Sequence, residues 1–99
     1  MAYEVRIAPA AGRSIGKLPA NIQDLILEAI EALAGEPRPA GSRKARGLPR
    51  QFEVYRLVVA KGYRVIYQIR DEAAWVLVLK GGDRKDVYRR VGDLKRLLR

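Results

Sequence analysis

The stretch that decides the fold is Tyr55–Arg90, YRLVVAKGYRVIYQIRDEAAWVLVLKGGDRKDVYRR. Most of it alternates polar with apolar residues, a period of two that predicts β-strands with one buried face. Short turn signals at Lys61-Gly62 and Asp71-Glu72 divide it into three strands. We expect these strands at about residues 52–59, 63–70 and 74–81. Because turns this short join antiparallel neighbours, the stretch predicts a meander.

Strand alternation assigns the two faces of this meander. One face is expected to pack on helices and form the core: Tyr55, Leu57, Val59, Tyr63, Val65, Tyr67, Ile69, Trp75, Leu77 and Leu79. The other face is mixed: Arg56, Val58, Arg64, Ile66, Gln68, Val76, Val78 and Lys80. If residues 60–62 and 71–73 are three-residue loops, Arg64 lies opposite both Val58 and Lys80. Neighbouring strands are roughly 4.8 Å apart, so this register predicts that Arg64 and Lys80 can bind one phosphate together.

The residues before the meander predict one strand and two helices. Tyr3, Val5 and Ile7 alternate with charged residues up to Pro9, which predicts a short strand. A weak helix is expected around Ala11, Ile15 and Leu18, because glycines interrupt it. A stronger helix follows Pro19, with the apolar stripe Ile22, Leu25, Ile26, Ala29, Ile30 and Leu33. Gly35 and Pro37 end that helix, and residues 35–50 predict a basic loop.

After the meander, Asp86 can cap a last helix with Val87, Val91, Leu94 and Leu98 on one face. The complete order predicts an α+β fold: an N-terminal strand and helical hairpin packed on a twisted antiparallel β-sheet, then a short C-terminal helix. At 99 residues the chain predicts a single domain, 1–99.

The charge of the chain is strongly uneven. The net charge is +9, and arginines outnumber lysines fourteen to six. Residues 1–40 carry four basic and five acidic side chains, whereas residues 41–99 carry sixteen and six. The basic excess therefore lies in the second part, where it can attract a polyanion. Arginine binds phosphate with two parallel hydrogen bonds, which favours contact with nucleic acid or the ribosome over a purely solubilising charge.

The composition also excludes several kinds of chemistry. The chain has no cysteine and no histidine. Disulfides, thiolate metal sites and nucleophile pairs that need histidine are therefore excluded, and no cofactor is expected. No apolar run approaches membrane-spanning length and the N-terminus is not a signal peptide, so a cytoplasmic protein is expected.

Motifs along nearly the whole chain resemble the RelE branch of the RelE/ParE toxin superfamily. They are the MAYEV opening, the helical hairpin, KARGLP before the meander, GYRVIYQI followed by DE, and the closing G-D-R then DVY. The resemblance implies a toxin of a type II toxin–antitoxin system. It further implies an endoribonuclease that cuts messenger RNA in the ribosomal A site and is held inactive by a small acidic antitoxin.

The resemblance also implies site residues. Its catalytic positions correspond to Arg56, Arg64, Arg84 and Tyr88 in this chain. The implied reaction needs no metal: the RNA 2′-hydroxyl attacks the neighbouring phosphorus and leaves a 2′,3′-cyclic phosphate and a 5′-hydroxyl. Further RNA contacts are expected at the basic residues Arg43, Lys44, Arg46, Lys61, Lys85 and Arg89.

One departure from the family pattern concerns the general base. The two alternate strand lysines of the family correspond here to Arg56 and Val58. A guanidinium does not deprotonate in proteins, and valine has no proton chemistry. Lys80 is the substitute predicted by the register above, either as a base or as a phosphate ligand.

Two other functions stay open at this stage. A ParE-like inhibitor shares the fold but blocks DNA gyrase by binding, without chemistry. A plain basic RNA-binding module is the third alternative. The order of Arg56, Arg64, Arg84 and Tyr88 favours the ribonuclease, whereas the missing strand lysines keep the gyrase inhibitor open as an alternative.

Overall fold

The computed structural model describes residues 2–49 and 51–88 of the chain. The elements follow one another as β1 (Glu4–Ile7), α1 (Pro9–Gly16), α2 (Ala20–Ala32), β2 (Ser42–Lys44), β3 (Val54–Val59), β4 (Tyr63–Arg70), β5 (Trp75–Asp83) and α3 (Arg84–Tyr88). A 3-10 turn, Asp71–Ala73, joins β4 to β5. Val91, Leu94 and Leu98 of the predicted last helix lie outside the described residues.

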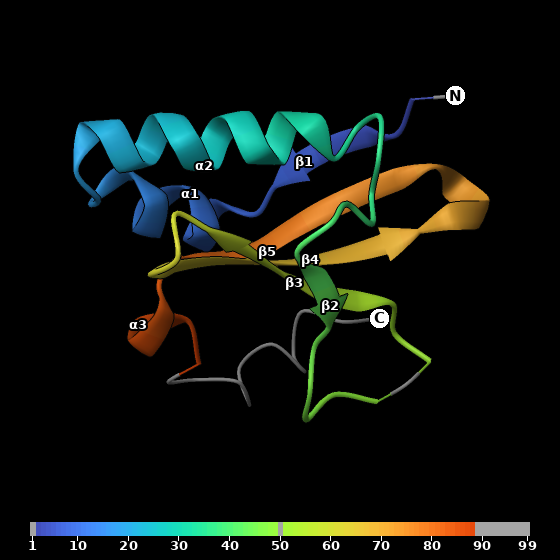
Figure 1. Ribbon diagram of the computed structural model, residues 1–99. Coiled ribbons are helices and arrows are strands. Elements are labelled where there is room, and N and C mark those ends of the chain that lie inside the picture. Colours follow the sequence, from blue (N-terminus) through green and yellow to red (C-terminus); the bar gives the residue numbers. More distant parts are fainter. Residues whose placement is uncertain (1, 50, 89–99) are drawn as a thin grey trace.

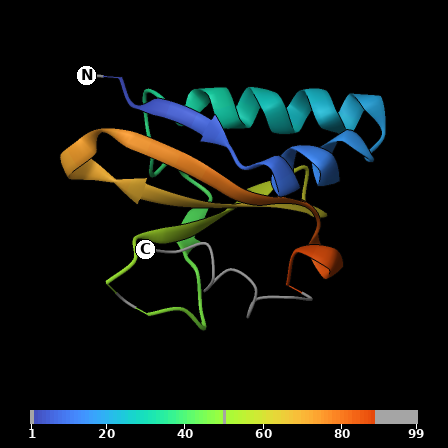
Figure 2. The ribbon, with the colours of Figure 1, turned by 180° about the vertical axis from the view of Figure 1, so that it is seen from behind.

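The strands form one mixed sheet in the order β1-β5-β4-β3-β2. β1 runs parallel to β5, and the other neighbours are antiparallel. Helices α1 and α2 cover one face of the sheet, whereas α3 and the β2–β3 loop lie on the other (Figure 1). Seen from behind, β1 lies along the edge of the sheet beside β5 (Figure 2). The predicted α+β architecture is therefore confirmed, with β2 added inside the stretch that predicted only a loop.

The face toward α1 and α2 carries the main core. Helix residues such as Ile15, Ile26 and Ile30 pack there against Leu57, Val65 and other strand residues, and Tyr67 is fully buried. A second apolar cluster lies on the opposite face. It joins Val54, Ile66, Leu79 and Val87, with Leu48, Phe52 and Leu77 packed against them. Because the second cluster includes Val87 of α3, it fixes that helix, which begins at Arg84.

The predicted faces are correct for β3 and β4 but wrong for much of β5. Val76 and Val78, expected on the outer face, are completely buried in the helix-side core, while Leu77 and Leu79 lie in the second cluster. The cause is the turn before β5. Arg70 pairs with Trp75, so the loop has one residue more than predicted, and Ala74 takes a left-handed conformation (φ 53°). A shift of one residue exchanges the faces of a strand.

A bulge then changes the register a second time. Tyr67 pairs with Val78 but Ile66 pairs with Lys80, which leaves Leu79 as an extra residue. Arg64 consequently lies opposite Gly82, and the predicted pairing of Arg64 with Lys80 is wrong. The other predicted neighbour, Val58, does lie opposite Arg64. On α2, Leu25 is 45% exposed and does not belong to the core stripe in which it was expected.

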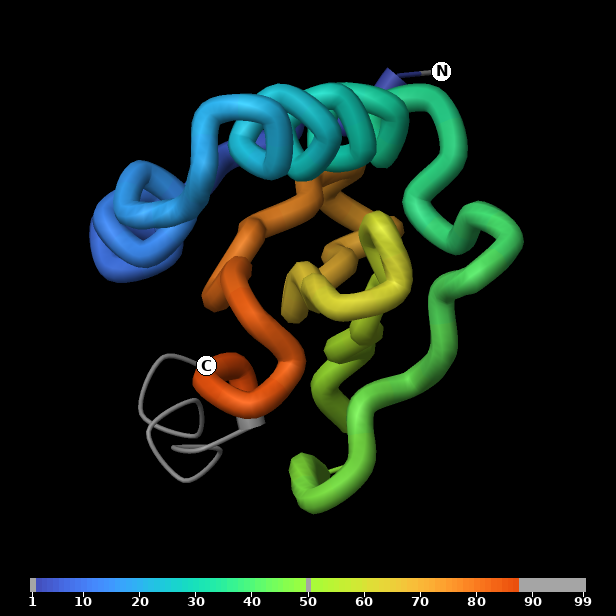
Figure 3. The backbone as a smooth tube through the Cα atoms, turned by 60° about the vertical axis from the view of Figure 1, so that its left-hand side comes forward, coloured from blue at the N-terminus to red at the C-terminus, as the bar shows by residue number. Residues whose placement is uncertain are grey.

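A polar network holds the long α2–β2 connection, which passes from the helix layer to the far side of the sheet (Figure 3). Arg38 donates to both carboxylate oxygens of Asp71 (3.2 and 2.8 Å) and lies over the ring of Tyr55. The hydroxyl of Tyr3 donates to Asp71 at 2.6 Å, which ties the N-terminal residues to the same carboxylate. The buried hydroxyl of Tyr67 donates to the carbonyl of Pro37 at 2.7 Å, and burial raises the pKa of Tyr67 to about 12.

We expect Asp71→Asn to lower stability by about 1 kcal/mol at neutral pH, because the carboxylate is about half exposed and its ion pair is partly screened. The hydrogen bonds from Arg38 and Tyr3 lower the pKa of Asp71 to about 2. An acid whose pKa is depressed in the folded state stabilises above its unfolded pKa, about 3.9, and loses that contribution as the pH falls toward its folded pKa. The difference in melting temperature between parent and variant should therefore be constant above about pH 5, be much reduced near pH 2 and vanish about one pH unit lower. Asp24→Asn, on the exposed side of α2, serves as the control. A difference that persists unchanged at pH 2 would contradict this assignment.

A second prediction concerns the contact between α1 and β5. A Cβ atom at Gly81 would lie 2.9 Å from both Cδ1 and Cγ1 of Ile15. Gly81→Ala should therefore overpack this contact and destabilise the fold by about 1–2 kcal/mol. In an Ile15→Ala background, which lacks both of these atoms, the cost of Gly81→Ala measured by denaturant unfolding should be smaller. Gly16→Ala is the control, since nothing lies within 4 Å of that position. Equal costs in the two backgrounds would disprove the proposed clash.

Candidate phosphate-binding site

Four arginines from four different segments line one open hollow of about 380 Å³ on the face of the sheet opposite α1 and α2. They are Arg46 of the β2–β3 loop, Arg56 of β3, Arg64 of β4 and Arg84 at the start of α3. The structure thus brings together three of the predicted catalytic residues, and adds Arg46, which was expected only as an RNA contact. Among the described residues, none of these four arginines forms an ion pair.

Arg64 is the most constrained of the four. It is only 9% exposed, and its Nη1 donates to the carbonyls of Lys61 (2.7 Å) and Tyr63 (2.9 Å). Its buried Nε has no hydrogen-bond partner. Unpaired buried donors are rare in folded proteins and indicate a missing partner such as an anion or water. The sequence placed Arg64 on this face but did not predict its burial.

The β3–β4 turn positions both Arg64 and Arg84. Its carbonyl at Lys61 accepts from the Arg64 guanidinium, and its carbonyl at Gly62 accepts from the backbone N–H of Arg84 at 2.9 Å. Ala60 and Lys61 in this turn have positive φ angles of 48° and 61°. Such angles cost energy in residues other than glycine. The turn is therefore held by the contacts it makes with the site.

Arg56 extends the basic surface toward β2. It pairs in register with Arg43 on one side and with Ile66 on the other. Like charges directly opposite one another destabilise a sheet. No acidic residue lines the hollow. The arrangement therefore favours binding of an anion, and arginine forks are suited to the oxygen atoms of a phosphate.

The remaining predicted residues lie around this hollow or away from it. Lys61 in the β3–β4 turn and Lys85 in α3 are both exposed. Lys44 faces away, since it pairs in register with Tyr55 and its Nζ bonds to Glu53 at 3.4 Å. The backbone of Tyr88 belongs to α3, but its side chain and all of Arg89 lie outside the described part of the chain.

Lys80 is not in the arginine hollow. It lines a neighbouring one with Ser14, Lys17 and Asp86, between α1 and α3. Its pairing with Ile66 places it diagonally from Arg64, rather than opposite. The predicted role of Lys80 as a base was inferred from a pairing with Arg64, and the structure does not show that pairing.

Two kinds of feature are absent from the described residues. Within residues 2–49 and 51–88, no group of three or more histidine, cysteine, aspartate or glutamate side chains is placed to hold a metal ion. No helix in that part of the chain is long and apolar enough to cross a membrane.

Comparisons with known proteins agree with this fold. Residues 5–88 match the family described as the ParE toxin of the type II toxin–antitoxin system parDE. The toxin RelG of Mycobacterium tuberculosis is 36% identical over 91 residues, which cover 91% of this chain and all of RelG. Among solved structures, a free Escherichia coli RelE toxin with two arginines replaced by alanine is similar at a TM-score of 0.73 and 26% identity, covering 95% of this chain and 98% of that one. A chain of the RelBE2 toxin–antitoxin complex of M. tuberculosis is similar at a TM-score of 0.70 and 27% identity, covering 85% and 100%. The chain therefore belongs to the RelE/ParE family of type II toxin–antitoxin system toxins.

Proposed function

We propose that this toxin is an endoribonuclease that cuts messenger RNA bound in the A site of the ribosome, in the cytoplasm, and so inhibits translation. The observation that carries the proposal is the convergence of Arg46, Arg56, Arg64 and Arg84 on one hollow without a neutralising carboxylate. Single-stranded RNA offers closely spaced phosphates to such a site.

The proposed reaction is attack by the 2′-hydroxyl on the adjacent phosphorus. The new O–P bond forms as the bond to the 5′-oxygen breaks, which leaves a 2′,3′-cyclic phosphate and a 5′-hydroxyl. Negative charge grows on the non-bridging oxygens, where preorganised donors contribute most to the rate. We assign Arg56 and Arg64 to these oxygens and Arg84 to the leaving oxygen, with Tyr88 orienting a nucleotide.

The proton of the 2′-hydroxyl needs an acceptor from outside the lining of the hollow, because guanidinium groups do not deprotonate. The messenger RNA, the ribosome and water can all supply one. The 5′-oxygen takes up a proton from the same surroundings, since Arg84 can stabilise its charge but cannot protonate it. Since Lys80 lies beyond the hollow, we do not assign it this role. The protein's own contribution in this mechanism is electrostatic.

The partner that restrains the toxin is proposed to be a small acidic antitoxin. An acidic segment that covers the arginine hollow would neutralise the charges that act on RNA. Apolar side chains that the alternation placed on the same face as the arginines could help such a segment bind. Of these, Val58 is exposed, at 39%, whereas Ile66, Val76 and Val78 are buried. We therefore expect a complex whose affinity falls steeply with added salt, and a salt-independent affinity would contradict this mode of binding.

The alternative function, inhibition of DNA gyrase, is favoured by the match to the ParE description. One experiment separates the two. Purified toxin is incubated with programmed ribosomes, with free RNA, and with gyrase and relaxed plasmid. We expect new 5′-hydroxyl ends only within ribosome-bound messenger RNA, and unaffected supercoiling. Inhibited supercoiling with intact messenger RNA would overturn the ribonuclease proposal.

We predict that Arg84→Ala slows cleavage about 10²-fold or more, as is typical when one preorganised donor is removed. The fold should persist, because Arg84 is exposed and its contact to Gly62 is made by the backbone. Arg64→Ala should slow cleavage similarly and also lower the melting temperature, since Nη1 no longer braces the turn. Arg13→Ala on α1 removes the same charge far along the chain from the hollow and should cleave normally. The measured quantity is the single-turnover rate of cleavage on programmed ribosomes. Equal rates for Arg84→Ala and Arg13→Ala would show that Arg84 does not take part in cleavage.

A further inference from the structure

Gln68 is a buried polar side chain that the fold leaves unpaired. It lies on the same face of β4 as Arg64, opposite Val54 and Leu77, and is only 3% exposed. Within the described part of the chain, no hydrogen bond engages its amide group. Among the described residues, the side-chain polar atom that is fully enclosed without a partner is Nε of Arg64, so the amide atoms of Gln68 keep a small contact with solvent. An unpaired amide on a side chain that is otherwise almost completely buried can therefore take a hydrogen-bond partner only from the space it opens to.

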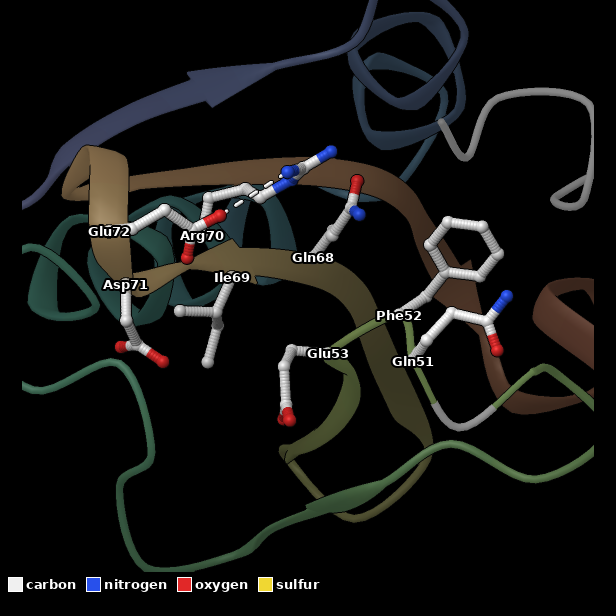
Figure 4. Close-up of a pocket in the computed structure, with 8 residues that line it drawn as sticks. All are labelled: Gln51, Phe52, Glu53, Gln68, Ile69, Arg70, Asp71 and Glu72. Carbon is white, nitrogen blue, oxygen red and sulfur yellow. Dashed lines mark hydrogen bonds and ion pairs between the residues drawn. The ribbon is translucent and has the colours of Figure 1, made fainter.

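The amide lies at a hollow of about 430 Å³ (Figure 4). On the side to which the Gln68 amide points, its other walls are the ring of Phe52, the amide of Gln51 and the ion pair of Arg70 with Glu72, whereas Glu53 and Asp71 point to the opposite side (Figure 4). In contrast to the arginine hollow, the charged side chains on this side are paired with each other. No excess positive charge therefore attracts a phosphate there, whereas an uncharged planar group with donors and acceptors on its edge would be accommodated.

The two hollows are connected by shared residues. Phe52 also lines a third hollow beneath the β2–β3 loop, together with Leu48 and Arg46, and Arg46 in turn lines the arginine hollow. Along β4, Gln68 and Arg64 are four residues apart on one face, which corresponds to about 13 Å of strand. A strand of RNA with a phosphate at the arginines can therefore reach Gln68 with a nearby nucleotide.

We propose that Gln68, Phe52 and Gln51 form a subsite for an unpaired nucleobase of the RNA whose phosphate binds the arginines. Phe52 offers an aromatic surface for stacking, and an amide can donate to and accept from one base edge at the same time. This subsite deepens the proposed ribonuclease function and rests on it for the identity of the RNA. It would give the toxin a preference among codons that the arginines cannot supply, since phosphate contacts carry no sequence information.

The direct test is nuclear magnetic resonance of the ¹⁵N-labelled protein titrated with each of the four ribonucleoside 3′-monophosphates, and with inorganic phosphate. The expected result is a shift of the Gln68 side-chain NH₂ signals with nucleotides but not with phosphate, and dissociation constants that differ about ten-fold among the four bases. Phosphate alone should shift only the Nε signals of the arginine hollow. Gln68 signals that respond to no nucleotide, or equally to phosphate, would overturn the subsite.

Two glutamine variants complete the test. Gln68→Met should leave the melting temperature unchanged or higher and abolish the ten-fold discrimination. Gln23→Met is the contrast, because Gln23 Nε2 donates to the carbonyls of Gly16 (3.1 Å) and Leu18 (2.7 Å). A loss of stability in Gln68→Met as large as in Gln23→Met would show that the amide serves the fold, and would overturn the proposal. Because these measurements need no ribosome, nucleotide binding at Gln68 by a protein that cuts no messenger RNA would refute only the ribonuclease function.

Discussion

The β3–β4 turn is the constraint on which the site depends. Four guanidinium groups around one hollow repel one another, so backbone contacts must hold them in place. The turn positions two of the four residues, by accepting at Lys61 from the guanidinium Nη1 of Arg64 and at Gly62 from the backbone N–H of Arg84. The positive φ angles of Ala60 and Lys61 show that the turn keeps an unfavourable conformation while making these bonds. The second apolar cluster supports the same arrangement, because Val87 anchors α3 directly after Arg84.

The sequence predicts this site well where its strands have simple turns. β3 and β4 are joined by the expected three-residue loop, so the register of Val58 with Arg64 and the faces of both strands are correct. Arg84 was expected in the site from the resemblance to the family, and it lines the arginine hollow. Alternation and turn length are local properties, which is why these predictions succeed.

The predictions fail where a single residue changes the register. The left-handed Ala74 lengthens the β4–β5 turn, and the bulge at Leu79 changes the pairing again two residues before Gly81. Glycine is the residue expected in a left-handed conformation, so an alanine there could not be predicted from the sequence. A bulge adds one residue without changing the apolar pattern in a recognisable way, so it could not be predicted either. The place of Arg46 was equally hidden, since irregular loops have no periodicity. The burial of Arg64 and Gln68 was also hidden, because the second apolar cluster on their face joins strand residues to residues of the β2–β3 loop and α3 that are distant in the sequence.

The central claim is that phosphates of RNA bind in the arginine hollow, and the salt dependence of binding tests it most directly. The affinity for an RNA whose 2′-hydroxyls are methylated, and which therefore cannot be cut, is measured from low to moderate salt. For single strands, the slope of log affinity against log salt concentration becomes shallower by about 0.7 for each phosphate that the protein no longer neutralises. We predict this shallower slope for the Arg56→Ala and Arg84→Ala variants, and an unchanged slope for Arg13→Ala. Slopes that are the same in all three variants would contradict the claim.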